Sequence, residues 1–340
     1  MRKIALDKAE LLYEALAKNY ALYMPVDTDA GAEYKKWEKG TKLSNALNTV
    51  RSAKDFFFPQ TENLMDFKME GKTIEIIDTR EESEDFIIFG VRACDVKSFE
   101  VLDGAFLEGY VDTFYKNRRD HAVIFSMACN KPAQTCFCQT FDIDASKPDG
   151  DVRLYKDEEY LYLDAVTEKG EKLLASLDVL ACGGEKEAEA VAATIKARLE
   201  KLPLASLKKD AFGDGKTSEF FDAPEWKSLS EACIGCGTCT FVCPTCQCYD
   251  IKDINTGHGV KRFRCWDSCM YSEFTKMSAG QPRLTQLERF RQRFMHKLVY
   301  YPTAHNGLFS CVGCGRCLSR CPIQMNIVKV MKELGGKKNG

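Results

Sequence analysis

Two short cysteine runs near the carboxyl end constrain this chain more strongly than any other feature of its sequence. Both runs have the spacing C-x2-C-x2-C-x3-C-P. The first comprises Cys233, Cys236, Cys239 and Cys243, and the second comprises Cys311, Cys314, Cys317 and Cys321. This spacing is typical of chains that hold two 4Fe–4S clusters, in which the fourth cysteine of each run ligates the other cluster.

The spacing follows from the geometry of a cubane cluster. Two-residue gaps let a tight loop direct three sulfurs at one cluster, and the helix that follows carries the fourth cysteine away from it. We therefore expect two crossed ligand sets: Cys233, Cys236, Cys239 and Cys321 for one cluster, and Cys311, Cys314, Cys317 and Cys243 for the other. Zinc is the main alternative, but zinc sites seldom use three evenly spaced cysteines followed by C-P.

The cysteine content agrees with metal binding. Seventeen cysteines in 340 residues are many for a reducing compartment, where thiols at fixed spacings hold metals more often than they form disulfides.

No apolar run approaches the ~18 residues that a membrane span needs. Acidic residues interrupt the apolar residues at the amino terminus, so no signal peptide is expected. We expect a cytoplasmic protein.

Charge is unevenly distributed along the chain, whose net charge is −2. Residues 1–223 contain 31 Lys and Arg against 42 Asp and Glu, whereas residues 224–340 contain 17 against 8. Because a 4Fe–4S cluster held by four thiolates is anionic, we interpret the basic part as compensation for bound clusters. A nucleic-acid surface is a weaker alternative, since no recognition motif accompanies the basic residues. Arg316 and Arg320 lie inside the second run, so we expect the two clusters to differ in potential.

The hydrophobic patterns predict two regions of different fold class. Residues 1–207 are expected to form an α/β domain with a mixed sheet, residues 208–223 a linker, and residues 224–340 a mainly α-helical two-cluster ferredoxin-like domain with little strand. The amino-terminal elements expected are helices at 7–18 and within 168–202 and strands at 73–77, 86–91, 122–127 and 154–166.

The segment 288–298 is expected to be an amphipathic helix of the carboxyl-terminal domain. Its apolar stripe would be buried, and it consists of Phe290, Phe294 and Leu298. Its basic residues would form a solvated face to which an acidic partner could dock; they are Arg289, Arg291, Arg293 and Lys297.

Four further cysteines follow predicted strands of the α/β domain. Cys94 follows the strand at 86–91, and Cys129 follows the strand at 122–127, with Cys136 and Cys138 shortly after. If the two strands are parallel, these cysteines meet at the carboxyl edge of the sheet, where α/β domains place ligand sites. We expect them to hold a third 4Fe–4S cluster; the alternative is that each is a small buried apolar residue.

The remaining cysteines are assigned less specific roles. Cys246, Cys248, Cys265 and Cys269 flank the first run, and we favour packing over a further metal site. Cys182 is expected to be structural. Outside the cysteines, the sequence contains no G-x-G-x-x-G after a predicted strand and no phosphate-binding P-loop motif, so no nucleotide site is expected. Redox centres without a catalytic constellation indicate an electron relay.

The motifs together resemble one protein family. They are FGVRACDVKSFEVLD (89–103), CFC (136–138), CIGCGTCTFVCPTCQC (233–248), RCWDSCM (264–270) and the second cysteine run. The family is that of iron–sulfur subunits which includes the A subunit of anaerobic sulfite reductase and the β subunit of soluble NiFe hydrogenases of the sulfhydrogenase type. The resemblance implies a dicluster domain, and assembly with a flavin subunit that exchanges electrons with NAD(P)H.

These features predict an electron-transfer subunit of a cytoplasmic anaerobic oxidoreductase complex, which relays electrons between the flavin subunit and a catalytic redox subunit. No catalytic residue of its own is expected, and no nucleic acid or membrane span is involved. The alternative is a free-standing iron–sulfur enzyme that activates a substrate on a cluster held by only three cysteines. An iron–sulfur nucleic-acid-binding protein is a third hypothesis.

Overall fold

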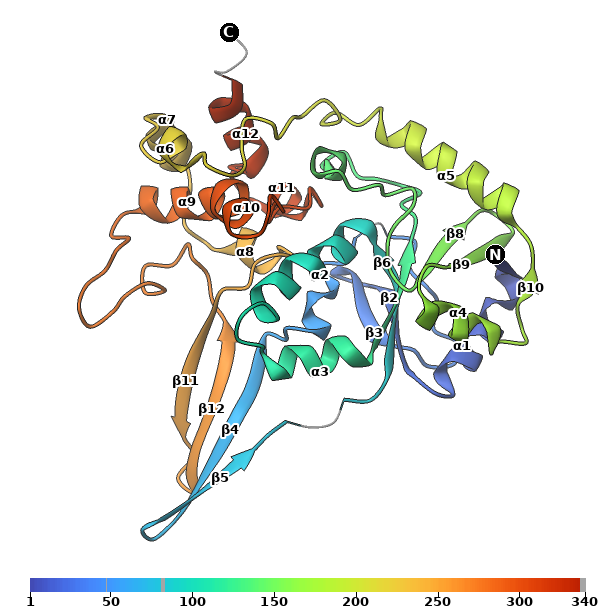
Figure 1. Ribbon diagram of the computed structural model, residues 1–340, viewed down its shortest axis with the longest axis horizontal. Coiled ribbons are helices and arrows are strands. Elements are labelled where there is room, and N and C mark those ends of the chain that lie inside the picture. Colours follow the sequence, from blue (N-terminus) through green and yellow to red (C-terminus); the bar gives the residue numbers. More distant parts are fainter. Residues whose placement is uncertain (47, 81–82, 337–340) are drawn as a thin grey trace.

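The computed structural model describes residues 1–46, 48–80 and 83–336, and its larger sheet has eight strands in the order β10-β1-β9-β8-β7-β6-β2-β3 (Figure 1). These strands are β1 (Arg2–Ala5), β2 (Ala21–Thr28), β3 (Gly31–Lys36), β6 (Phe86–Arg92), β7 (Ala122–Met127), β8 (Val152–Lys156), β9 (Tyr160–Ala165) and β10 (Ala181–Cys182). The pairs β2–β6, β6–β7 and β7–β8 are parallel, and the other pairs are antiparallel. The predicted mixed sheet is confirmed.

Helices cover both faces of this sheet. They are α1 (Ala9–Ala17), α2 (Ala93–Phe106), α3 (Thr113–His121), α4 (Glu168–Ala175) and α5 (Glu185–Leu199), with short 3-10 turns η1 (Leu6–Lys8), η2 (Ala53–Phe56) and η3 (Cys138–Phe141). Side chains alternate along β6, so that Ile87 packs in a core with α1 and α4, and Ile88 packs in a core with α2 and α3. Every residue of β6 and β7 is buried, which explains their continuous apolar runs.

The carboxyl-terminal region contains several short helices around the cysteine runs. They are α6 (Thr217–Phe220), α7 (Glu225–Glu231), α8 (Thr238–Phe241), α9 (Gln286–Met295), α10 (Tyr301–Ala304), α11 (Arg316–Arg320) and α12 (Ile327–Gly335). A capping box of Thr285 and Glu288 starts α9, which continues into a π-helical turn, η4 (His296–Tyr300).

The segment 288–298 buries more of its surface than the sequence suggested. Its apolar stripe is buried, as expected: Phe290, Phe294 and Leu298. The expected solvated basic face is wrong for two of its four members, since Arg293 and Lys297 are each only 3% exposed. Both lie at helical spacing within the buried stripe and face the cysteine loops, as described below.

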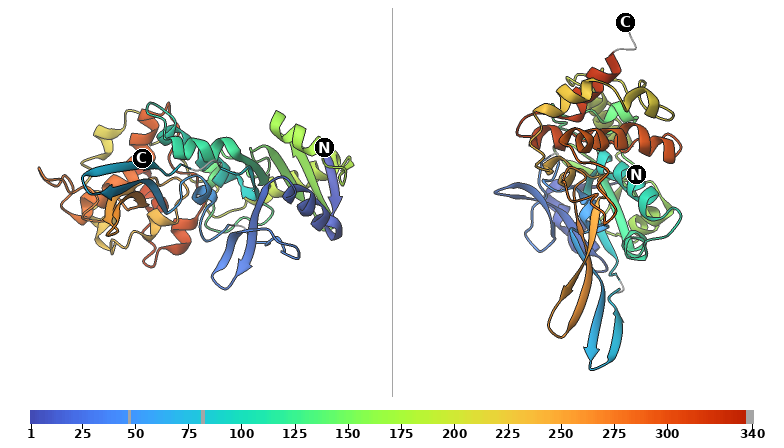
Figure 2. Two further views of the ribbon diagram at one scale, coloured as in Figure 1. Left: turned by 90° about the horizontal axis from the view of Figure 1, so that it is seen from below. Right: turned by 90° about the vertical axis from the view of Figure 1, so that its left-hand side faces the viewer.

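A second, four-stranded sheet corrects the expectation of little strand beyond residue 224. Its order is β11-β12-β4-β5, with β4 (Thr61–Glu70), β5 (Thr73–Asp78), β11 (Tyr249–Asn255) and β12 (Gly259–Trp266). The expectation fails because β12 pairs with β4, which lies far away in the sequence, and local patterns do not indicate such a pairing. The two hairpins project together from the body of the molecule (Figures 1 and 2).

Residues 208–223, expected to be a linker, pack against the carboxyl-terminal helices. The rings of Phe212 and Phe220 stack with centroids 5.0 Å apart, and both belong to one apolar core with residues of α5, α9 and α12. The division into domains at 1–207 and 224–340 stays a prediction. No helix within residues 1–46, 48–80 and 83–336 is long and apolar enough to cross a membrane.

Candidate metal centres

The first cysteine run shares a small cavity with the last cysteine of the second run. The cavity is lined by four thiols, those of Cys233, Cys236, Cys239 and Cys321. Phe290 and Arg293 of α9 also line it. Helix α8 begins after Gly237 and leads the chain from Cys239 toward Cys243, which lies outside this cavity. This grouping is the one that the crossed ligand sets require, and the assignment itself stays a prediction.

Cys243 instead lies among the other thiols of the second run. Burial raises the pKa of Cys311 to about 12 and raises the pKa of Cys314 and Cys317. Cys243 is close enough to each of these three thiols to raise its pKa further. The fourth cysteine of each run therefore lies with the first three of the other run.

The loop of the second run lies directly against the CFC segment of the α/β region. The backbone N–H of Phe137 donates to the carbonyl oxygen of Gly313 at 2.9 Å. Gly313 has a φ of +58°, and a Cβ there would lie 2.4 Å from the carbonyl oxygen of Phe137. Only glycine satisfies both the left-handed backbone and this close approach.

The four cysteines predicted to hold a third cluster line one small cavity. They are Cys94, Cys129, Cys136 and Cys138, and all four are buried. The cavity lies at the carboxyl ends of β6 and β7, which are parallel, as the sequence argument required. Burial raises the pKa of Cys129 and of Cys138 to about 12, so both thiols are neutral at pH 7 without a bound metal. A metal centre would hold them as thiolates.

Three buried basic side chains from outside the two runs lie near these thiols. Lys297 donates through Nζ to Thr245 Oγ1 at 2.8 Å and to the Ser310 carbonyl oxygen at 3.0 Å. Lys54 donates through Nζ to the Cys246 carbonyl oxygen at 2.9 Å, and its Nζ lies 3.8 Å from the ring centroid of Trp266. The third cation is Arg293, whose guanidinium lies 4.4 Å from the ring centroid of Phe294.

The neighbours that favour the charged forms of Arg293 and Lys297 are cysteines. Burial by itself lowers the pKa of both groups, but neighbouring cysteines outweigh it and raise each pKa above its usual value. Neither residue forms an ion pair with a carboxylate in the part of the chain that the structure describes, and Arg293 Nε is buried there without a hydrogen-bond partner. Because a buried charge needs compensation, these cations fit anionic clusters bound by the surrounding cysteines.

The other cysteines near the first run lie in three places. Cys248 and Cys269 form a hydrogen-bonded thiol pair, and Cys246 forms the same kind of pair with Cys243. Cys265 lies on β12 opposite Asp250. Packing stays our interpretation for all four of these cysteines.

Two further observations concern the whole set of cysteines. Cys182, expected to be structural, is exposed and accepts a hydrogen bond from Arg2 at 2.7 Å. Over residues 1–46, 48–80 and 83–336, no three His, Cys, Asp or Glu side chains converge as the ligands of a single metal ion do.

The buried cations were not identified from the sequence. Arg293 and Lys297 lie at helical spacing with Phe290 and Phe294, and this register was a signal that they share the buried stripe. Lys54 lies in the short turn η2, and nothing in its sequence neighbourhood indicates burial.

Comparisons with known proteins agree with this geometry. A family model described as a 4Fe–4S dicluster domain matches residues 232–325. The chain is 30% identical over 334 aligned residues to a protein of Pyrococcus furiosus named sulfhydrogenase 2 subunit beta, and the alignment covers 92% of each chain. No solved structure matches the chain.

Proposed function

The chain belongs to the family of iron–sulfur β subunits of hydrogenases, and from this premise we propose that it relays electrons within a multisubunit oxidoreductase. Its partners would be a flavin subunit that exchanges electrons with NAD(P)H and a catalytic redox subunit of the hydrogenase or sulfite reductase type. The complex would act in the cytoplasm under anaerobic conditions.

The observation that carries this proposal is the succession of three thiol sets through the molecule. The sulfur of Cys136 in the amino-terminal set lies 4.0 Å from the carbonyl oxygen of Cys314 in the second set. Cys317 of the second set is in turn an electrostatic neighbour of Cys239 in the first set. A continuous series of redox sites, each beside the next, is what one-electron transfer through a protein requires.

The residues of this chain would hold and tune the redox centres. A 4Fe–4S cluster ligated by four cysteines accepts and releases one electron at a time. Lys297 and Arg293 keep positive charge beside the two carboxyl-terminal sets, which favours the more negative, reduced state. Cys94, Cys129, Cys136 and Cys138 together line the amino-terminal cavity. This four-cysteine lining supports electron transfer over substrate activation on a three-cysteine cluster.

Exposed apolar side chains support assembly with other subunits. The projecting hairpins carry four exposed isoleucines, which are Ile74, Ile76, Ile251 and Ile254. Ile74 and Ile76 share one face of the edge strand β5, and an exposed apolar pair on a projecting sheet would suit contact with another subunit.

The test is anaerobic purification of the tagged chain from its own host. A flavoprotein and a catalytic redox subunit should co-purify, and NADH or NADPH should produce electron paramagnetic resonance (EPR) signals of reduced clusters in the complex. A chain that purifies alone, with clusters that no nicotinamide nucleotide reduces in the crude extract, would count against the relay.

A further inference from the structure

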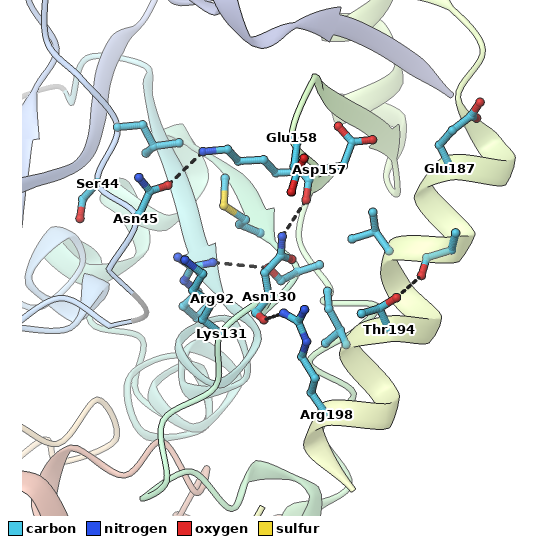
Figure 3. A pocket seen from close by; sticks show the side chains of 17 residues that line it. Ser44, Asn45, Arg92, Asn130, Lys131, Asp157, Glu158, Glu187, Thr194 and Arg198 are labelled. Carbon is cyan, nitrogen blue, oxygen red and sulfur yellow. Dashed lines mark hydrogen bonds between the residues drawn. The ribbon is translucent and has the colours of Figure 1, made fainter. Parts of the chain in front are cut away.

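A large cavity lies on the α/β region, at the carboxyl ends of three parallel strands (Figure 3). Arg92, Met127 and Lys156 are the last residues of β6, β7 and β8, and all three line it. Helix α5 forms the opposite wall with Val191 and Ile195. The volume is about 590 Å³, within the ~300–1,000 Å³ range of small-molecule sites, and open α/β sheets bind ligands at this edge.

One side of the cavity is positively charged. Lys156 lines this side, and its Nζ donates to Asn45 Oδ1 at 3.0 Å. Partial burial lowers the pKa of Lys156, and the nearby cations Lys131 and Arg92 lower it further. Arg92 is buried at the floor and donates to the carbonyl oxygens of Ala46 and Ala128. Lys131 and Arg92 therefore disfavour the charged form of Lys156, and a bound anion would relieve that repulsion.

The described acidic residues that line the cavity form no ion pair with Lys131 or Lys156. Asp157 is turned to its own loop, where its carboxylate accepts from the backbone N–H of Tyr160 at 2.7 Å and from the Tyr162 hydroxyl at 2.6 Å. Glu158 and Glu187 are exposed, and Figure 3 shows Glu187 on α5, on the side of the cavity opposite Asn45.

An amide oxygen in the same cavity also lacks a partner. Asn130 donates through Nδ2 to the carbonyl oxygen of Lys156 at 2.7 Å, and its own carbonyl oxygen accepts from Arg198 Nη1 at 2.5 Å. Its Oδ1 is buried and has no hydrogen-bond partner among the described residues. Since an unpaired buried acceptor is costly, this atom suits a ligand that also carries a donor group.

We propose that this cavity binds a small organic anion, with its charged group at Lys156 and Lys131 and its apolar body against Met127, Val191 and Ile195. Arg92 lines both this cavity and the cavity of the four amino-terminal cysteines. Only the side chain of Arg92 therefore needs to separate the bound charge from that thiol set. A negative charge at this place disfavours reduction of a cluster held by the four cysteines. This redox consequence rests on the proposed function, whereas the binding itself does not.

The test is calorimetric titration of the anaerobically purified chain with four probes. AMP and benzoate are organic anions with phosphate and carboxylate groups, inorganic phosphate lacks an apolar body, and adenosine lacks a charge. We expect AMP or benzoate to bind at one site, at least about tenfold more tightly than adenosine or inorganic phosphate. Lys156→Gln should weaken that binding about tenfold, as should Lys131→Gln, while Lys172→Gln on the exposed side of α4 should not change it.

Several results would overturn the site. These are the failure of both organic anions to bind, equal affinity for adenosine or inorganic phosphate, and affinities that neither lysine variant changes. The redox consequence has its own measurement, the midpoint potential of the EPR signal that Cys94→Ser abolishes. The bound anion should lower this potential, and binding without a change would refute the coupling. Failure of the relay would not alter the titration, so the two failures are distinguishable.

Discussion

Arg316 and Asp95 form a buried, doubly hydrogen-bonded ion pair between the second cysteine run and the amino-terminal thiol set. Nη1 and Nη2 of Arg316 donate to Oδ1 and Oδ2 of Asp95 at 2.5 and 2.7 Å. Asp95 directly follows Cys94, and Arg316 lies between Cys314 and Cys317. Asp95 therefore compensates the charge of Arg316, which was expected to contribute to a difference in potential between the two clusters. The ion pair also fixes the two thiol sets relative to each other.

Removing the acid of this pair should destabilise the protein strongly. Asp95→Asn keeps the shape of the side chain but leaves the Arg316 guanidinium buried and uncompensated, at a cost of about 3–5 kcal/mol. The measurement is anaerobic thermal unfolding. Asp120→Asn is the matched control, because Asp120 pairs with Lys116 on the exposed surface of α3 and should cost less than about 1 kcal/mol. Equal effects of the two substitutions would contradict this role of the pair.

The crossed ligand sets predict which cysteine variants share a phenotype. Cys321→Ser should perturb the same EPR signal as Cys233→Ser, although Cys321 belongs to the other run in sequence. Cys243→Ser should likewise match Cys311→Ser. The measurement is EPR of the dithionite-reduced variants, with iron content determined in parallel. If Cys321→Ser instead reproduced Cys311→Ser, each run would hold its own cluster and the crossed sets would be wrong.

The buried cation Lys297 should raise the potential of the carboxyl-terminal clusters. Lys297→Met keeps the length of the side chain and removes its charge, which makes the reduced state less favourable. We expect a midpoint potential lower by roughly 50 mV, equivalent to about 1 kcal/mol for one electron. Redox titration monitored by EPR measures it. Arg320→Gln, at an exposed position in α11, is the control and should shift the potential less. An unchanged or higher potential in Lys297→Met would be inconsistent with this assignment.

His296 should make the fold sensitive to acid. Burial lowers its pKa from 6.5 to about 4, with a further contribution from neighbouring Lys297. Between these two values the unfolded state binds the proton more strongly, so stability falls as pH decreases from about 6.5 to 4, by about 2 kcal/mol at pH 5. His296→Gln should show a smaller loss of thermal stability between pH 7 and pH 5 than the unsubstituted protein.

The exposed His258 provides the control for this experiment. His258→Gln should retain the full acid sensitivity, because His258 lies in the turn between β11 and β12 and is exposed. Equal pH dependence in both histidine variants would show that His296 does not contribute.

The parts of the fold that the sequence predicted are those with strong local patterns. The strands β6 and β7 are continuous apolar runs because both faces of the sheet are covered. The pairing of β12 with β4 was missed, since exposed strands with many charged residues carry little periodic signal and the partner lies far away in the chain. Strand β2 was also missed, and it contains Pro25 and Asp27, which are disfavoured in strands.

The cysteine spacing is informative for a related reason. A cubane imposes a fixed spacing on its ligands, so the sequence itself carries the geometry of the two runs. The cations around them follow no such rule. Whether Arg293 faces solvent or the thiols depends on which segment covers α9, and only the tertiary structure answers that question.

Metal analysis of the anaerobically purified chain tests the central claim most directly. Iron, acid-labile sulfide and zinc are counted per chain, and the visible absorbance is followed during reduction and reoxidation. Three four-iron clusters predict about twelve irons and about twelve sulfides per chain, with absorbance that bleaches reversibly. About eight irons would show that the amino-terminal cluster is absent and the two carboxyl-terminal clusters are present. Zinc in place of iron, or a colourless protein without redox activity, would contradict the account.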